Sequence, residues 1–214
     1  MAAELALTLA GEPMQVLGDR ALYWPARQRL LIADLHLGKG DVFRRAGIAL
    51  PRGGTLHDLQ RLTELIARTQ ARSLWILGDV LHGPAPHAAW RAQLAQWRAH
   101  HALLEIAALA GNHDRVLAKA GLDMQLLPDQ VEDGPFLLRH EPDTHPELHV
   151  LCGHVHPQFK PPGTTRRWPA FWRRAGLTVL PAFSQFTAGV VPALQPGEQL
   201  IACVEGAAIA LPPA

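Results

Sequence analysis

Short apolar runs of strand length recur along the whole chain, and most of them end in polar residues. A continuous run of this kind is typical of a buried β-strand, whereas apolar residues at every third or fourth position are typical of a helix. The pattern predicts strands over 5–10, 14–17, 21–24, 29–35, 73–77, 104–110, 124–127, 136–139, 148–151, 166–174, 177–183 and 199–211.

Helical spacing appears between the first buried strands. One helix is expected to begin with Thr55 as its N-cap and to end near Thr69, on the apolar positions Leu56, Leu59, Leu62, Leu65 and Ile66. A second is expected over 87–102, opened by Pro84 and Pro86, with inner positions at Ala89, Leu94, Ala95 and Trp97. Residues 115–120 predict a short helix, and 40–54 a loop or short helix. The order strand–helix–strand–helix–strand, then mostly strands, predicts an α/β protein with two packed sheets flanked by helices.

Composition narrows the class of protein. A chain of 214 residues is long enough for a sizeable core, so we expect one domain over 1–214. No apolar run approaches the roughly 20 residues of a membrane span, so we expect no membrane partner. Cys152 and Cys203 are too few for a disulfide framework, which favours a reducing, cytoplasmic location. The net charge of +1 neither demands nor excludes nucleic acid as a partner.

Side chains that can bind metals follow several of the apolar runs. Asp34 and His36 come at the end of 29–35, and alternation along a strand is expected to place both on one face. Ligands gather at the carboxyl ends of the strands in open α/β sheets, so these loops are expected to meet. The full set of candidate ligands is Asp34, His36, Asp79, Asn112, His140, His154 and His156.

The number and type of these ligands predict two metal ions. Seven side chains are too many for one tetrahedral ion, and nitrogen with oxygen favours Mn, Fe, Zn or Co. Two cations neutralise the charge of a phosphoryl group and lower the pKa of an attacking water. Cys152 is close in sequence to His154, but the histidines complete the set without it, so we interpret it as a core residue.

Taken together, the motifs resemble those of the calcineurin-like binuclear metallophosphoesterases. They are Asp34-Leu35-His36, Gly78-Asp79, Gly111-Asn112-His113-Asp114, His140 and Gly153-His154-Val155-His156. The resemblance implies a four-layer α/β/β/α sandwich of two mixed sheets flanked by helices. It implies that Asp34, His36 and His156 bind the first ion, that Asp79 bridges, and that Asn112, His140 and His154 bind the second. His145 and His149 compete with His140 for its place.

The resemblance also implies catalytic residues. His113 matches the histidine that contacts the phosphate or protonates the leaving oxygen, with Asp114 as its partner. His82 matches a histidine of the related double-strand-break repair nucleases that aids phosphodiester cleavage.

A narrower resemblance is to the bacterial ligase-associated DNA-damage-response endonucleases. It is carried by Asp34–Lys39, Phe43–Ile48, Pro51 and Leu180–Thr187. It implies manganese-dependent incision of DNA, preferably single-stranded, by attack of a metal-bridging hydroxide on a phosphodiester. It also implies a role in DNA repair with a functional link to a DNA ligase and a helicase.

Basic residues near the site are the expected substrate contacts. These residues either bind flanking phosphates or form a solvated basic loop. They are Lys39, Arg44 and Arg45, together with Arg52. Weaker candidates are Arg166, Arg167, Arg173 and Arg174. Among them, the aromatic residues Trp168, Phe171 and Trp172 either stack on bases or pack in the core.

Two other functions remain open. A phosphatase or pyrophosphatase acting on a nucleotide or small phosphoester is the second hypothesis, because it would use the same metals. A non-catalytic binding module on the same fold is the third.

Overall fold

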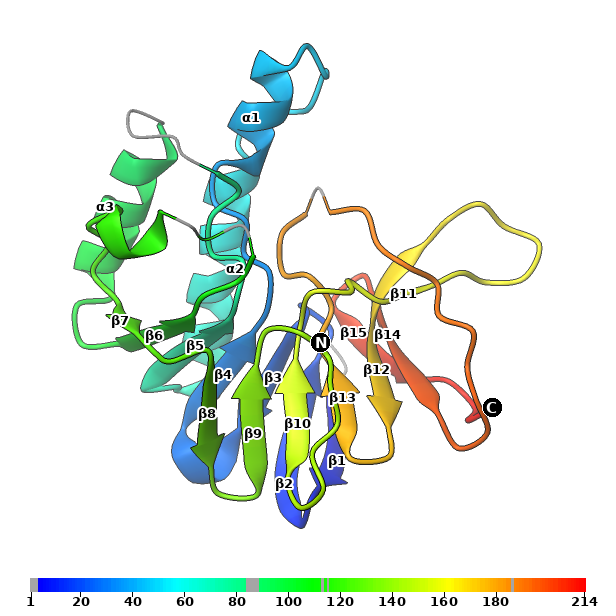
Figure 1. Cartoon of the computed structure of the whole chain (residues 1–214). Coiled ribbons are helices and arrows are strands. Elements are labelled where there is room, and N and C mark those ends of the chain that lie inside the picture. The colour runs from blue at the N-terminus through cyan, green and yellow to red at the C-terminus, as the bar shows by residue number, and fades with distance from the viewer. Residues whose placement is uncertain (1–3, 84–88, 113, 115, 186) are drawn as a thin grey trace.

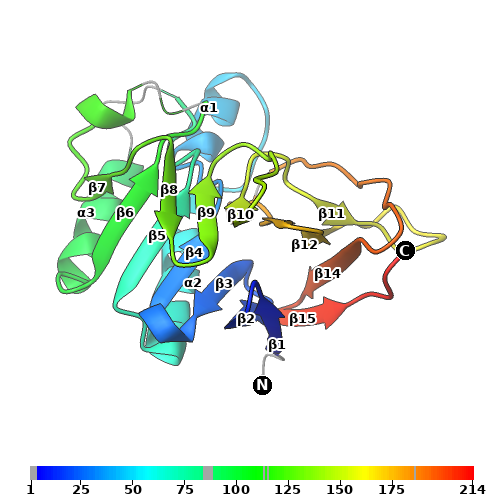
Figure 2. The same ribbon diagram turned by 60° about the horizontal axis from the view of Figure 1, so that its bottom comes forward.

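Two mixed β-sheets pack face to face in the computed structural model, which describes residues 4–83, 89–112, 114, 116–185 and 187–214 (Figures 1 and 2). The first sheet has the strand order β1-β2-β3-β4-β5-β6-β7. Its strands are β1 (Leu5–Leu9), β2 (Glu12–Leu17), β3 (Ala21–Trp24), β4 (Arg29–Ile32), β5 (Ser73–Leu77), β6 (Glu105–Leu109) and β7 (Gln125–Leu126). The first four pair antiparallel as a meander, and β4 to β7 pair parallel.

The second sheet has the order β15-β14-β12-β13-β10-β9-β8, with β11 paired to β12. Its strands are β8 (Gln130–Asp133), β9 (Phe136–Arg139), β10 (His149–Cys152), β11 (Gln158–Phe159), β12 (Trp168–Arg174), β13 (Leu177–Val179), β14 (Gln199–Val204) and β15 (Ala207–Ala210). Only its central strands β9, β10 and β13 pair parallel among those described.

The described helices precede Ala120 in the chain. They are α1 (Lys39–Arg45), α2 (Gly54–Thr69), α3 (Trp90–His100) and two 3₁₀ turns, η1 (Pro25–Arg27) and η2 (Leu117–Lys119). Figure 1 shows α2 and α3 against the first sheet, on the side away from the second, and α1 projecting from the top of the molecule. None of these helices is long and apolar enough to cross a membrane.

Burial on both faces explains why the central strands are apolar throughout. Leu30 and Ile32 of β4 pack toward α2 and α3, and Leu31 packs toward the second sheet. Between the sheets, the rings of Trp24 and Phe136 meet edge to face with their centroids 4.9 Å apart. The predicted sandwich of two mixed sheets is therefore confirmed, with its described helical layer on the first sheet.

Several local predictions were wrong. Thr55 lies inside α2, whose N-cap is Gly53, because a left-handed Gly53 lets the chain turn into the helix two residues earlier than predicted. Residues 199–211 form two strands rather than one, since Glu205 and Gly206 both have positive φ and turn the chain. Ala89 and Ala95 are exposed rather than inner positions.

Other differences concern two strands that the hydrophobic pattern did not indicate and segments outside the described residues. The polar strands β8 and β11 carry no apolar run that would have indicated them. The predicted starts of the helices at 87 and 115, and the prolines Pro84 and Pro86, lie outside the described residues.

Candidate metal centre

The loops that follow β4, β5, β6, β9 and β10 meet at the carboxyl ends of these strands, where open α/β sheets bind ligands. The backbone N–H of Asp34 donates to the Gly78 carbonyl at 3.2 Å, and that of His36 donates to the Asp79 carbonyl at 2.8 Å. The Gly153 N–H donates to the His140 carbonyl at 3.0 Å. Backbone hydrogen bonds therefore join these loops to one another.

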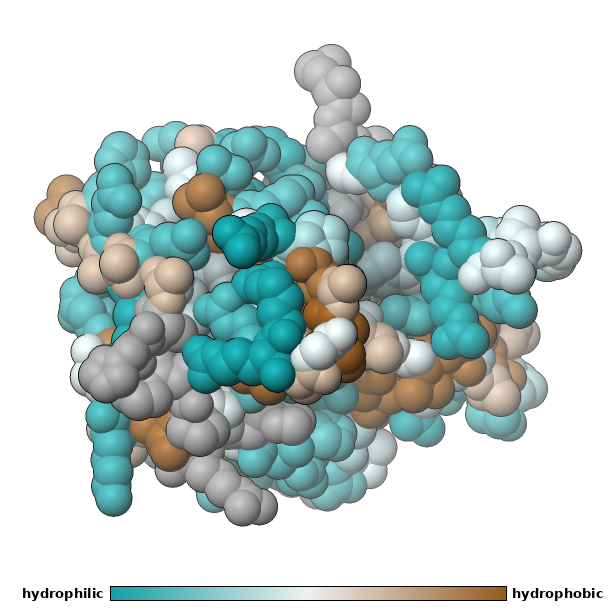
Figure 3. Space-filling view, turned by 90° about the horizontal axis from the view of Figure 1, so that it is seen from above, coloured by the Kyte–Doolittle hydropathy of each residue, from teal (hydrophilic) through white to brown (hydrophobic). Residues whose placement is uncertain are grey.

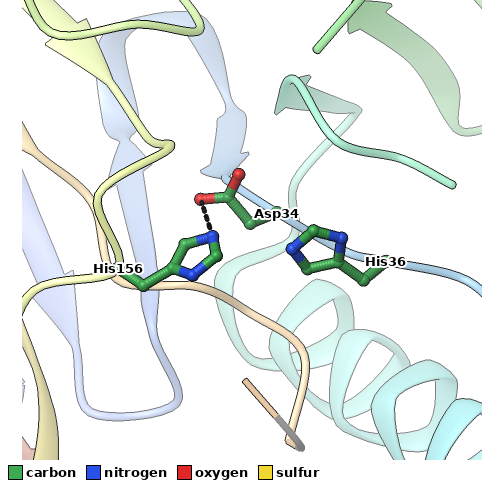
Figure 4. Close-up of side chains that lie close together, drawn as sticks. All are labelled: Asp34, His36 and His156. Carbon is green, nitrogen blue, oxygen red and sulfur yellow. Dashed lines mark ion pairs between the residues drawn. The ribbon is translucent and has the colours of Figure 1, made fainter. Parts of the chain in front are cut away.

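Asp34 lies at the middle of this meeting point and is fully buried. Its Oδ2 accepts a hydrogen bond from the His154 N–H at 3.0 Å and lies 3.5 Å from His156 Nε2 (Figure 4). Its Oδ1 lies 3.8 Å from His140 Nδ1 and has no hydrogen-bond partner among the described residues. A buried carboxylate oxygen without a hydrogen bond indicates that a cation belongs beside it.

Two groups of donor atoms share Asp34. The atoms of Asp34, His36 and His156 lie within 4.8 Å of one another, and so do those of Asp34, Asp79 and His140. Asp79 faces both groups, because its Oδ2 is 4.0 Å from His36 Nε2 and its Oδ1 is 3.7 Å from His140 Nε2. This placement agrees with the bridging position predicted for Asp79.

Asn112 and His154 complete the second group. Asn112 Oδ1 and His154 Nδ1 each lie 3.1 Å from His140 Nε2. These separations fit ligands of one ion, because two ligands at right angles, each about 2.1 Å from the ion, lie about 3 Å apart. The structure brings all seven predicted ligands together. It does not bring in His145, whose Nδ1 accepts from the Leu148 N–H, or His149, which meets Thr178 Oγ1 at 2.9 Å.

Hydrogen bonds to the backbone set the tautomers of two histidines. His140 Nδ1–H donates to the Leu77 carbonyl and His156 Nδ1–H to the Ala188 carbonyl, both at 3.0 Å. Each bond leaves the Nε2 lone pair directed into the centre, which is how proteins usually orient a metal-binding histidine. His156 Nε2 is buried and has no hydrogen-bond partner in the described part of the chain.

Strand alternation does not place Asp34 and His36, contrary to the prediction. Strand β4 ends at Ile32, and both residues have positive φ, of 55° and 47°. Asp79, His154 and His156 also have positive φ, of 46°, 70° and 53°. A left-handed residue other than glycine costs roughly 1–2 kcal/mol, so the surrounding packing holds these loops in a conformation they would not adopt alone.

Three glycines of the motifs make room for the ligands. A Cβ at Gly78 would overlap the His140 ring, and one at Gly111 would overlap the Asp79 carboxylate. A Cβ at Gly153 would lie 2.7 Å from Asp34 Oδ2. These glycines are required by close approach to the donor groups.

Asp114 fastens two of the loops and has the contacts of a positioning residue. Its Oδ1 accepts from the Leu81 N–H at 2.7 Å, and its Oδ2 accepts from the Val80 and Gly111 N–H groups at 3.0 and 2.9 Å. Burial raises the pKa of Asp114, and these backbone donors oppose the rise. Its predicted partner His113 lies outside the described residues.

The donor set fits hard or borderline divalent cations. All the converging atoms are nitrogen or oxygen. Burial raises the pKa of both cysteine thiols, and Cys152 packs with Leu137 and Val179 on the outer face of the second sheet. The interpretation of Cys152 as a core residue agrees with this placement.

A polar cavity of about 400 Å³ opens beside His36. Lys39, Arg44 and Arg52 line it, together with the first residues of α2, whereas Arg45 is exposed on α1 and does not. Burial lowers the pKa of Lys39, and the nearby carboxylates of Asp34 and Asp79 oppose that effect. The ring of His82 meets that of His36 edge to face, with centroids 5.2 Å apart.

A cluster of buried charges beneath the centre was not predicted. Arg61 of α2 donates to the Phe183 carbonyl and to Asp58 Oδ1, and Arg20 donates to the Ser184 carbonyl at 2.9 Å. In turn, the Ser184 N–H donates to the Asp34 carbonyl at 3.2 Å. Asp58 and Arg61 lie on the apolar face of α2, and that break in the pattern was the available sign of their role.

Comparison with known proteins agrees with this geometry. The family model described as calcineurin-like phosphoesterase matches residues 29–156, which include every predicted ligand. The crystal structure of Pseudomonas putida nuclease MPE superposes with a TM-score of 0.84 at 36% identity, covering 97% of this chain and 100% of that one. Yfce, a phosphoesterase from E. coli, matches with a TM-score of 0.47 at 20% identity over 85% of this chain and 96% of its own. The comparison with curated proteins found no match. With the motifs, the fold and the family model in agreement, the chain belongs to the calcineurin-like phosphoesterases and is a metal-dependent hydrolase of phosphoesters.

Proposed function

We propose that this protein is a manganese-dependent endonuclease that cuts single-stranded DNA. The observation that carries the proposal is the pair of donor groups that share Asp34 and face Asp79, beside a cavity lined by cationic side chains. The likeness to nuclease MPE over nearly the whole of both chains supports a nucleic-acid substrate rather than a small metabolite. A role in DNA repair, with a functional link to a DNA ligase and a helicase in the cytoplasm, is part of the same proposal.

The chain's own residues would divide the work of hydrolysis. Two divalent cations, when bound, supply charge neutralisation at the phosphoryl group and a water of lowered pKa. The carboxylates of Asp34 and Asp79 fix the donor groups relative to each other, and the backbone bonds of His140 and His156 keep their rings oriented. His82, packed edge to face against His36, is proposed to protonate the departing sugar oxygen. His113 is proposed for the same step.

An assay on circular DNA tests the proposal. The metal-stripped protein is supplied with Mn, Mg, Zn, Fe or Co and given single-stranded circles, duplex circles and a small chromogenic phosphodiester. We expect Mn to support the fastest opening of single-stranded circles, which only internal cleavage can produce. Hydrolysis of the small diester without any cutting of the circles would instead favour the phosphatase or pyrophosphatase hypothesis.

A pair of aspartate variants ties the activity to this site. Asp79→Asn is expected to lower the rate of cutting by roughly 10²–10³-fold, because it removes a charged donor that faces both groups. Asp123→Asn removes the same charge from an exposed position before β7, toward the amino ends of the parallel strands, and is expected to retain the wild-type rate. Equal rates for the two variants would show that the activity arises elsewhere.

A further inference from the structure

Two polar cavities flank the metal centre. His36 lines the cavity described above, and His156 lines a second one of about 240 Å³. Figure 4 shows these two histidines on either side of the Asp34 carboxylate. Ser184 lines both cavities, so they adjoin each other beside the donor groups. Hydrophilic residues predominate on the face of the molecule seen from above, where α1 projects (Figure 3).

The cavity beside His36 has an uncommitted positive charge at its rim. Arg44 pairs with Asp41 and donates to the Pro51 carbonyl at 3.0 Å, so its guanidinium is already engaged. Arg52 is exposed and has no carboxylate partner within the described ranges. Next to it begin Gly54 and Thr55 of α2, whose first backbone N–H groups have no acceptor within the helix. An anion entering this cavity would meet the Arg52 guanidinium and the first backbone N–H groups of α2.

The cavity beside His156 repeats this chemistry with different residues. Arg167 is exposed and has no carboxylate partner in the part of the chain that the structure describes. Gln158 and Arg20 add further N–H donors to the lining, and Arg20 is held in place by the Ser184 carbonyl. Its donors therefore come from β11, from the loop before β12 and from the turn after β2.

One side-chain contact closes the gap between the cavities. Lys39, which lines the first cavity, donates from Nζ to Thr187 Oγ1, which lines the second, at 3.2 Å. Lys39 is buried and close enough to Asp34 and Asp79 for their charges to act on it. Positive charge thus continues from one cavity to the other past the donor groups.

We infer that the substrate is a phosphodiester chain that crosses the centre, with the phosphate before the scissile one in one cavity and the phosphate after it in the other. This inference rests on the proposed function and adds a requirement that the nuclease assignment does not contain. The enzyme should need a further charged phosphate on each side of the linkage that it cuts. Arg52 and Arg167 should each recognise a different neighbouring phosphate.

A tetranucleotide with neutral linkages tests this inference. Three forms are compared, one with three natural phosphates and two in which either the first or the third is a methylphosphonate, which carries no charge. Cleavage at the middle linkage is followed by chromatography of the products, and the dissociation constant of each form by fluorescence anisotropy. In the wild-type protein, each neutral linkage is expected to lower kcat/KM and affinity by about 3- to 10-fold.

The arginine variants decide which cavity holds which phosphate. Arg52→Gln should lose the sensitivity to one of the two neutral linkages and keep the sensitivity to the other, and Arg167→Gln should show the opposite pattern. Arg72→Gln removes an exposed charge at the other end of β5 and should respond like the wild type. If both variants respond to the same linkage, or neither variant changes the response, the inference is wrong.

Failure of the inference and failure of the proposed function give different results. A wild-type protein that cuts the middle linkage equally well in all three forms is still a nuclease, but its cavities do not read the neighbouring phosphates. A wild-type protein that neither cuts nor binds the natural tetranucleotide contradicts both.

Discussion

At the scale of single residues, the centre depends on side chains and glycines that fit one another closely. Asp34 is buried, faces both donor groups and accepts a hydrogen bond from the His154 N–H. Gly153 lies directly against its carboxylate. The position of one carboxylate therefore depends on a residue that contributes no side chain.

Gly153→Ala is expected to weaken metal binding by roughly 10–100-fold, because the new Cβ would displace the Asp34 carboxylate. Metal affinity measured by calorimetry and the phosphodiesterase rate should fall together. Gly163→Ala is the control, since Gly163 has open space around it and a φ of +73°. That change should cost about 1–2 kcal/mol of stability and leave metal affinity intact. Wild-type affinity in Gly153→Ala would disprove the packing requirement.

Asp58 is a second residue whose surroundings set its chemistry. Burial raises its pKa to about 6, while Arg61 and Arg20 oppose the rise. The folded protein thus binds this proton more tightly than the unfolded chain, whose carboxyl titrates near 3.9. The contribution of Asp58 to stability is therefore favourable at low pH and is lost as the pH rises from about 4 to about 6.

Comparison with Asp58→Asn isolates this effect. The metal-free wild type should lose on the order of 2–3 kcal/mol of stability between pH 4 and pH 7 relative to the variant, whose amide does not titrate. Denaturant unfolding at several pH values measures the difference. Parallel pH dependences in the two proteins would show that Asp58 titrates normally.

At the scale of elements, the sequence predicted the strands and helices well where burial alone decides. The apolar runs of β4, β5 and β6 are buried on both faces, so the hydrophobic pattern was sufficient to identify them. Polar strands such as β8 were not predicted, because β8 forms by pairing with β9 and not by burying an apolar run. The motifs indicated the seven side chains that converge at the centre, but the local reason given for Asp34 and His36 was wrong. Left-handed loops, which no periodicity indicates, position Asp34 and His36.

Asp114 shows how such loops are held together. Asp114→Ala removes an acceptor shared by the backbone N–H groups of Val80, Leu81 and Gly111. We expect a loss of about 2–4 kcal/mol in stability, because three backbone donors, two of them buried, lose their partner, and a 10–100-fold loss of metal affinity. Asp114→Asn keeps one carbonyl oxygen and should recover part of both losses. An alanine variant that loses activity with unchanged stability and metal affinity would instead indicate a direct catalytic role.

At the scale of the whole molecule, the two sheets supply different halves of the site. The first sheet provides Asp34, His36, Asp79 and Asn112, and the second provides His140, His154 and His156. The apolar interface between the sheets therefore fixes the distance between the donor groups. The buried cluster around Arg61 reinforces this arrangement by binding the Phe183 and Ser184 segment beneath Asp34.

The most direct measurement is anomalous diffraction from crystals of the protein grown with manganese. Two peaks are predicted, roughly 3.5–4 Å apart, one beside Asp34, His36 and His156 and the other beside Asn112, His140 and His154, with Asp79 between them. A single peak at full occupancy, or two peaks that are not joined by Asp79, would contradict the binuclear centre.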